Sequence, residues 1–203
     1  MMEERRALQV EINELFRPFY PYLAAQLLEE YGKEEGHGLE LGPYGPGISI
    51  EMARRRPSMS FTAGDSDPEV NEYLREEIAR AGMAERIQVV TADKYRLAWA
   101  EGSLDLIFLR GGLFFWERHQ EILREFYRVL RSGGLAALGG GFGAATPDAL
   151  IEGRREASRN LNRRLGKRTL SLNDVKELIR EASLEGVARI DERHGLWVYL
   201  RKP

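Results

Sequence analysis

The order of apolar segments along the chain predicts an α/β protein. Short apolar runs typical of buried strands occur at 38–41, 58–64, 87–92, 104–109 and 135–138, and stretches with apolar residues at helical spacing lie between most of them. Two alternating runs at 187–191 and 196–201, joined across 192–195, predict a C-terminal hairpin. Alternating strands and helices favour a doubly wound, mostly parallel sheet.

The residues before the first strand predict two helices that Pro18 and Pro21 separate. Their apolar stripes are Leu8, Ile12, Leu15 and Phe16, and then Leu23, Ala24, Leu27 and Leu28. With 203 residues, the chain is long enough to bury one sizeable core and short for two. We therefore expect a single domain over 1–203, with a helical cap at 1–35 and an α/β core at 36–203.

Composition narrows the function classes. A formal net charge of −2 gives no overall attraction to nucleic acid or to anionic membranes. The absence of cysteine and the presence of three scattered histidines predict no metal site. No apolar run approaches the roughly 18 residues of a membrane span, and the N-terminus lacks a secretory core. We expect a cytoplasmic protein without a membrane partner; no pattern fixes its oligomeric state.

A glycine-rich turn follows the first strand. From Glu40 the chain reads E-x-G-x-x-G-x-G, with Gly42, Gly45 and Gly47 at the glycine positions and a predicted helix at 48–56. Glycines allow close approach of a ligand, and a helix N-terminus attracts an anion. The spacing is not that of a dinucleotide fingerprint. It resembles, with one extra residue, the first motif of class I S-adenosylmethionine (SAM)-dependent methyltransferases; a tight turn without a ligand is the alternative.

Later motifs extend this resemblance over roughly 38–143. Asp65 follows the second strand, 18 positions after Gly47, where an acid could bind both ribose hydroxyls; Asp67 is expected to cap the next helix. Asp93 and Lys94 follow the third strand, where the family contacts adenine, although Asp93 could instead cap a turn. The run R-V-L-R-S-G-G at 128–134 is similar to the family's R-V-L-K-P-G-G.

The resemblance implies a Rossmann-like methyltransferase fold: a seven-stranded, mostly parallel sheet whose last strand is antiparallel. It implies SAM as cofactor and S-adenosylhomocysteine (SAH) as product. The residues that it assigns to cofactor binding are Glu40, Gly42, Pro43, Tyr44, Gly45, Gly47, Asp65, Ser66, Asp93, Lys94 and Arg110. Arg110 could equally hold a substrate anion or form a structural ion pair.

Two further segments, R-G-G-L-F-F-W at 110–116 and G-G-G-F-G at 139–143, resemble the methyltransferase-11-like small-molecule group. In small methyltransferases an N-terminal helix pair often lies across the cofactor opening. Candidate substrate contacts are Tyr20, Tyr22, Phe114, Trp116 and Phe142, with core packing as the alternative. Glu117 and His119 are candidate general bases, although a polar helix start explains both equally well.

The chain is therefore expected to transfer a methyl group from SAM to a small-molecule acceptor. One alternative is an RNA methyltransferase that uses the basic segment 154–168. Nucleic acid is not the expected partner, because Glu156 interrupts the basic run and aromatic stacking residues are absent from it. The other alternative is a SAM-binding protein without catalysis.

Overall fold

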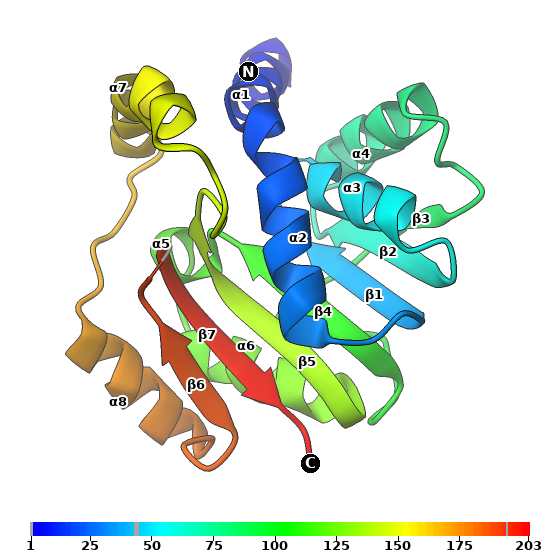
Figure 1. Cartoon of the computed structure of the whole chain (residues 1–203), viewed down its shortest axis with the longest axis vertical. Coiled ribbons are helices and arrows are strands. Elements are labelled where there is room, and N and C mark those ends of the chain that lie inside the picture. Colours follow the sequence, from blue (N-terminus) through cyan, green and yellow to red (C-terminus); the bar gives the residue numbers. More distant parts are fainter. Residues whose placement is uncertain (1, 43–44, 194) are drawn as a thin grey trace.

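The computed structural model describes residues 2–42, 45–193 and 195–203. Within these residues, seven strands form one sheet in the order β3-β2-β1-β4-β5-β7-β6 (Figure 1). The strands are β1 (Gly36–Leu41), β2 (Met59–Asp65), β3 (Ile87–Thr91), β4 (Leu104–Arg110), β5 (Leu130–Gly141), β6 (Ala188–Asp191) and β7 (Gly195–Arg201). Only β7 runs antiparallel to its neighbours, β5 and β6. The predicted sheet, with its antiparallel last strand, is confirmed.

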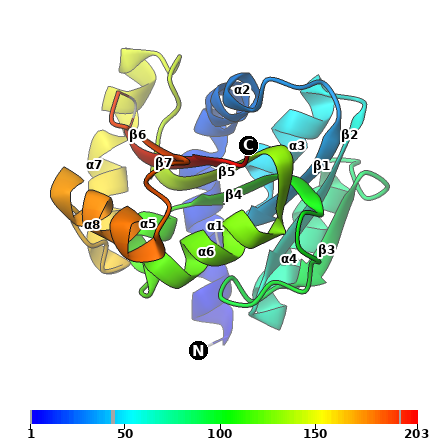
Figure 2. The ribbon, with the colours of Figure 1, turned by 90° about the horizontal axis from the view of Figure 1, so that it is seen from below.

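Helices cover both faces of the sheet (Figure 2). They are α1 (Met2–Phe16), the 3-10 helix η1 (Arg17–Phe19), α2 (Tyr20–Tyr31), α3 (Gly47–Arg55), α4 (Pro68–Arg80), α5 (Gly112–Phe115), α6 (His119–Val129), α7 (Asp148–Arg164) and α8 (Leu172–Ala182). Pro18 and Pro21 occupy the first turns of η1 and α2, where a missing N–H costs nothing. No helix in the described part of the chain is long and apolar enough to cross a membrane.

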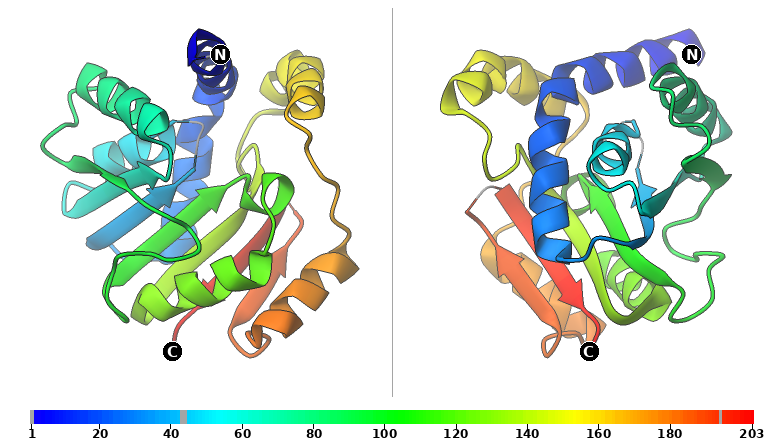
Figure 3. Two further views of the ribbon diagram at one scale, coloured as in Figure 1. Left: turned by 180° about the vertical axis from the view of Figure 1, so that it is seen from behind. Right: turned by 45° about the vertical axis from the view of Figure 1, so that its right-hand side comes forward.

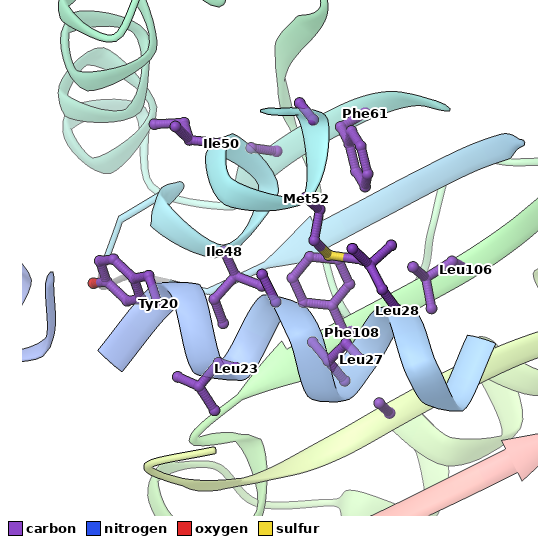
Figure 4. Close-up of a cluster of buried hydrophobic side chains, with 14 of the residues drawn as sticks. Tyr20, Leu23, Leu27, Leu28, Ile48, Ile50, Met52, Phe61, Leu106 and Phe108 are labelled. Atoms are coloured by element: carbon purple, nitrogen blue, oxygen red, sulfur yellow. The ribbon is translucent and has the colours of Figure 1, made fainter. Parts of the chain in front are cut away.

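The strand side chains alternate between two apolar clusters, one on each face of the sheet. Leu106 and Phe108 belong to the cluster under α2 and α3, whereas Ile107 and Leu109 belong to the cluster under α6 and α8. Figure 4 shows Met52 of α3 beside Phe108 in the first cluster. Period-two alternation with burial on both sides is what parallel strands between helices require, so the apolar runs could be identified from the sequence.

Some local predictions are also confirmed. The predicted cap at Asp67 forms, since its side chain accepts a hydrogen bond from the N–H of Glu69. The structure also contains a complete capping box at the start of α8, formed by Ser171 and Asp174. The fifth strand is longer than the predicted 135–138: it begins at Leu130, directly after α6, because Leu130 already pairs with Leu104 of β4.

The first helix lies across the carboxyl ends of the parallel strands. In Figure 3, α1 extends from α7 to α4. Ion pairs fix both sides: Arg6 pairs with Glu76 of α4, and Glu11 pairs with Arg164 of α7 at 2.6 Å. The second helix, in contrast, packs on the face of the sheet. Of the predicted helical cap, α1 therefore covers the strand ends and α2 is part of the layered core.

Candidate active site

The glycine loop follows β1 at the point where the strand order reverses. β1 pairs with β2 on one side and with β4 on the other, and ligands of open α/β sheets bind at such a switch point. Gly42 and Gly45 have φ angles of 128° and 133°, in the region that favours glycine. A Cβ on Gly42 would lie 3.2 Å from Leu109. Pro43 and Tyr44, predicted cofactor contacts, lie outside the described residues.

Glu40 of β1 binds the helix that follows this loop. Its buried carboxylate accepts a hydrogen bond of 2.9 Å from the backbone N–H of Ser49 in the first turn of α3. Burial raises the pKa of Glu40 to about 7, although the Ser49 hydrogen bonds act in the opposite direction. The carboxylate therefore links β1 to the start of α3. This geometry favours positioning of the loop over direct cofactor contact.

Gly47 and Tyr20 lie against each other. A Cβ on Gly47 would collide with the ring of Tyr20, so the glycine lets α2 approach α3 closely. The Tyr20 hydroxyl donates to Oδ1 of Asn13 at 2.9 Å, and burial raises the pKa of this tyrosine. Tyr20 therefore occupies a packed position beside the glycine loop, which differs from the substrate contact expected from the sequence.

Asn13 of α1 is a site residue that the sequence reasoning missed. Its Nδ2 donates to the hydroxyl of Tyr73 at 2.6 Å and to Glu77 at 2.8 Å, both on α4. Its Oδ1 would lie 2.7 Å from a Cβ on Gly45. Asn13 is 2% exposed. A lone polar residue beside an apolar helical stripe was the only signal in the sequence.

Asp65 ends β2 and lies half-buried at the strand edge. Its Oδ1 accepts from the N–H of Asp67 at 2.9 Å, and the hydroxyl of Ser66 lies 3.5 Å away. Burial raises the pKa of Asp65, whereas the Asp67 N–H and the charge of Lys94 lower it. The buried side chain of Asn71 binds the backbone of Asp65 on both sides. Asp65 is thus held where the resemblance expects a ribose-binding acid.

Asp93 and Lys94 follow β3. The carboxylate of Asp93 accepts a hydrogen bond from the N–H of Tyr95 at 2.9 Å. Asp93 thus makes the contact that the turn-capping alternative predicts. The ammonium group of Lys94 lies 5.0 Å from the ring of Tyr95 and 4.9 Å from the ring of Trp116. The two positions expected to face adenine therefore border an aromatic surface.

Trp116 lies on the side of the glycine loop. Its Cη2 would be 3.6 Å from a Cβ on Gly42, and its ring lies under Lys94. A cavity lies beyond the ends of β4 and β5. Phe114 and Phe142 are among the described residues that line it, whereas Trp116 is not. α5 ends at Phe115 and the backbone at Trp116 is extended, so Trp116 lies beside the glycine loop and not in the cavity wall.

A cavity of about 770 Å³ lies beyond the ends of β4 and β5. Its apolar walls include Phe16 of α1, Phe114 of α5 and Phe142 after β5, with Arg110 at the end of β4. The guanidinium of Arg110 lies 4.0 Å from the centre of the Phe16 ring. The glycine-rich segment 139–143 also contributes to its lining. Tyr22 is absent from the described lining residues; its backbone and Cβ lie against Gly143.

A second cavity of about 810 Å³ lies between α1 and α4. It shares Ile12, Phe115 and Leu165 with the first cavity and reaches Asp67, two residues from Asp65. The two hollows thus adjoin beneath α1. The second cavity borders the carboxyl end of β2, and the first cavity borders the carboxyl ends of β4 and β5.

The two candidate general bases lie outside the walls of both cavities, although Glu117 pairs with Arg168 of the first cavity wall. Glu117 is exposed and pairs with Arg168, which lowers the pKa of its carboxyl group. His119 is buried at the start of α6; burial lowers its pKa, whereas the backbone groups of Leu113 and Gly112 act in the opposite direction. Neither side chain is among the described residues that line the cavities. Their geometry favours the polar-helix-start alternative.

Comparison with known proteins decides the family. A methyltransferase-11 family model, described as a methyltransferase domain, matches residues 39–138, from β1 into β5. A Methanococcus maripaludis structure, described as a candidate SAM-dependent methyltransferase, superimposes with a TM-score of 0.80 and 28% identity, covering 99% of this chain and 93% of that one. The chain belongs to the SAM-dependent methyltransferases.

Two further matches cover less of the proteins compared. The ubiquinone/menaquinone biosynthesis C-methyltransferase UbiE of Geotalea daltonii is 32% identical over 88 residues, which is 43% of this chain and 37% of that relative. The match thus spans just over a third of the curated relative's length. PigF in complex with SAH has a TM-score of 0.62 at 22% identity, over 89% of this chain and 55% of PigF; this likeness shows the fold.

The methyltransferase therefore uses SAM, the cofactor of its family, and the strand edge offers a fit for it. Gly42 and Gly45 adopt φ angles suited to glycine, and the absence of a Cβ lets the loop lie close to Leu109 and Asn13 at this edge. Asp65 presents a carboxylate at the next strand end. When bound, SAM supplies an activated methyl group on a sulfonium sulfur. Among the described residues, no cluster of three or more potential metal ligands occurs.

Proposed function

We propose that this methyltransferase transfers the methyl group of SAM to a small organic acceptor held in the cavity beyond β4 and β5. The observation that carries the proposal is the cavity walled by Phe16, Phe114 and Phe142, which lies at the same edge of the sheet as Gly42 and Asp65. A cofactor and a small acceptor need such neighbouring sites, because in-line transfer requires both reactants in fixed orientation.

The cofactor is proposed to bind along the ends of β1, β2 and β3. Gly42 and Gly45 would let the backbone approach it closely, Asp65 with Ser66 would bind the ribose, and Lys94 with Trp116 would border the adenine. Pro43 and Tyr44 remain proposed contacts from the sequence, and Asp93 remains proposed at the adenine amino group. Arg110 lies between this edge and the acceptor cavity.

Catalysis here would rest mainly on positioning and on exclusion of water. The acceptor's lone pair forms the new bond to the methyl carbon while the carbon–sulfur bond breaks and its electron pair stays on sulfur. A protonated acceptor loses its proton to water or to a neighbouring base. Helix α1, fixed to α4 and α7 by ion pairs, would shield the reacting groups.

The basic segment gives less support to an RNA acceptor. Arg164 pairs with Glu11, and Arg168 pairs with Glu117, so part of the positive charge is used within the molecule. Phosphate binding depends on cations that are available to release counterions. A small acceptor therefore remains the better-supported proposal.

The test is SAH formation from SAM, followed by mass spectrometry, with panels of small phenols, amines and carboxylic acids and, separately, with total RNA. We expect SAH to form with at least one small acceptor, and no SAH above background with RNA. SAH formation only with RNA would replace the proposal. SAH binding without turnover on any panel would favour the non-catalytic alternative. Asp65→Asn, in which the proposed ribose contact is weakened, provides the inactive control.

A further inference from the structure

Two cationic side chains border the aromatic wall of the acceptor cavity. The guanidinium of Arg110 lies 4.0 Å from the ring centre of Phe16, and the ammonium of Lys167 lies 4.3 Å from that of Phe114. Both residues line the cavity. Arg110 reaches it from the end of β4, whereas Lys167 reaches it from the segment between α7 and α8, far away in the sequence.

Arg110 donates to the backbone oxygen of Gly141 at 3.3 Å, and two further cationic residues of the cavity wall are paired with carboxylates. Arg168 pairs with Glu117, and Arg193 pairs with Asp191 at 2.5 Å. Asp148 and Glu192 also line the cavity, but Lys167 differs from the two paired arginines, because no carboxylate of the described residues lies within ion-pair distance of its ammonium group. The cavity thus contains a cation that faces an aromatic ring and has no anionic partner in the described part of the chain.

The two cations also influence each other. Burial lowers the pKa of Lys167, and the positive charge of Arg110 lowers it further. Like charges that share a partly apolar cavity raise the free energy of the empty site. An anion bound in the cavity would offset this repulsion and gain charge-assisted hydrogen bonds.

We propose that the methyl acceptor is a small carboxylic acid, whose carboxylate binds Arg110 and Lys167 and whose apolar body packs against Phe114 and Phe142. This inference rests on the proposed function, because it names the substrate class of the same cavity. Rings and alkyl chains suit the apolar walls, and a carboxylate suits the paired cations.

The cofactor's own carboxylate is the other possible source of the anion. Lys167 lies over Phe114, whose ring would contact a Cβ on Gly140 of β5. This position is beside β5, whereas the proposed cofactor residues lie at the ends of β1, β2 and β3. The separation assigns Lys167 to the acceptor, and the experiment below distinguishes the two sources.

The test compares matched acids and amides on the SAH-saturated protein by isothermal titration. The probes are benzoate, phenylacetate and phenylpropionate, each with its amide. We expect at least one acid to bind tenfold or more tightly than its amide. Lys167→Met should remove this preference and leave SAH affinity within twofold. Lys176→Met, which removes the same charge from an exposed position on α8, should keep the preference.

Each contrary result has a distinct meaning. Acids that bind no better than their amides, or that do not bind at all, would overturn the inference. A parallel loss of SAH affinity in Lys167→Met would overturn it in favour of the cofactor's carboxylate. If SAH itself fails to bind the unaltered protein, the proposed function fails as well, so the two failures can be told apart.

Discussion

The side-chain amide of Asn71 holds the backbone of Asp65 on both sides. Oδ1 of Asn71 accepts from the N–H of Asp65, and Nδ2 donates to the carbonyl oxygen of Asp65, each at 2.9 Å. Asn71 lies in the first turns of α4 and is 1% exposed. The direction of the Asp65 carboxylate is therefore fixed by a helix that follows it in the chain.

Replacement of Asn71 tests this positioning role. Asn71→Ala leaves two backbone groups of Asp65 without their partners, so we expect the free energy of unfolding to fall by about 1–3 kcal/mol. SAH affinity should fall several-fold, because Asp65 is no longer held in place. Urea denaturation and isothermal titration measure the two effects. A destabilised variant that binds SAH as tightly as the unaltered protein would contradict the positioning role.

Gly45 offers a test of the glycine loop that follows β1. Its φ of 133° strains any residue with a Cβ, and that Cβ would lie 2.7 Å from Oδ1 of Asn13. We expect Gly45→Ala to lower SAH affinity by more than tenfold, as measured by titration. Gly153→Ala is the matched control, since open space surrounds Gly153 in α7; it should stabilise the helix by roughly 0.5–1 kcal/mol and leave SAH affinity unchanged.

The place of Trp116 predicts an optical signal. Its ring lies beside Gly42 and within 4.9 Å of the Lys94 ammonium, so a cofactor bound there should change its fluorescence. We expect SAH to alter the intrinsic emission of the protein. Trp116→Phe should abolish the change, whereas Trp99→Phe should retain it. A fluorescence change that persists in Trp116→Phe would show that Trp116 does not lie beside the bound cofactor.

Glu40 predicts a pH-dependent stability. Burial raises its pKa from 4.5 to about 7. Between these values the unfolded chain is ionised at this position and the folded protein is protonated, so the free energy of unfolding falls as the pH rises. This loss of stability is absent below pH 4.5 and complete above about pH 7. At its full size, it lowers the free energy of unfolding by up to about 3 kcal/mol.

Glu40→Gln removes this titration and keeps an oxygen that can accept from Ser49. We expect the variant to gain stability relative to the unaltered protein, by up to about 3 kcal/mol, when the pH is raised from about 5 to about 8. Urea denaturation at both pH values measures the change. Glu29→Gln, an exposed substitution on α2, should show no such trend. Parallel curves for Glu40→Gln and the unaltered protein would contradict the account.

Much of the fold could be predicted from the sequence because its signals are local. Alternating apolar positions, the cap at Asp67 and the capping box at Ser171 each depend on neighbours within a few residues. The glycine spacing after Glu40 likewise predicts a ligand site at the end of β1, and this remains a prediction.

The missed features depend on contacts between distant segments. Asn13 meets α4 some sixty residues away, and nothing in its own helix predicts this. The place of Trp116 beside Gly42, and of Lys167 over Phe114, follows from how the loops pack at the sheet edge. Tertiary packing of this kind leaves no periodic pattern in the chain.

The most direct test of the central claim, that the edge formed by β1 and β2 binds the cofactor, is isothermal titration of SAH into three proteins. The unaltered protein should bind SAH, and Asp65→Asn should lose at least tenfold in affinity because the proposed ribose contact loses its charge. Asp67→Asn keeps the cap on α4, since asparagine caps as well as aspartate, and should bind within threefold of the unaltered protein. Equal SAH binding by Asp65→Asn, or no binding by the unaltered protein, would contradict the account.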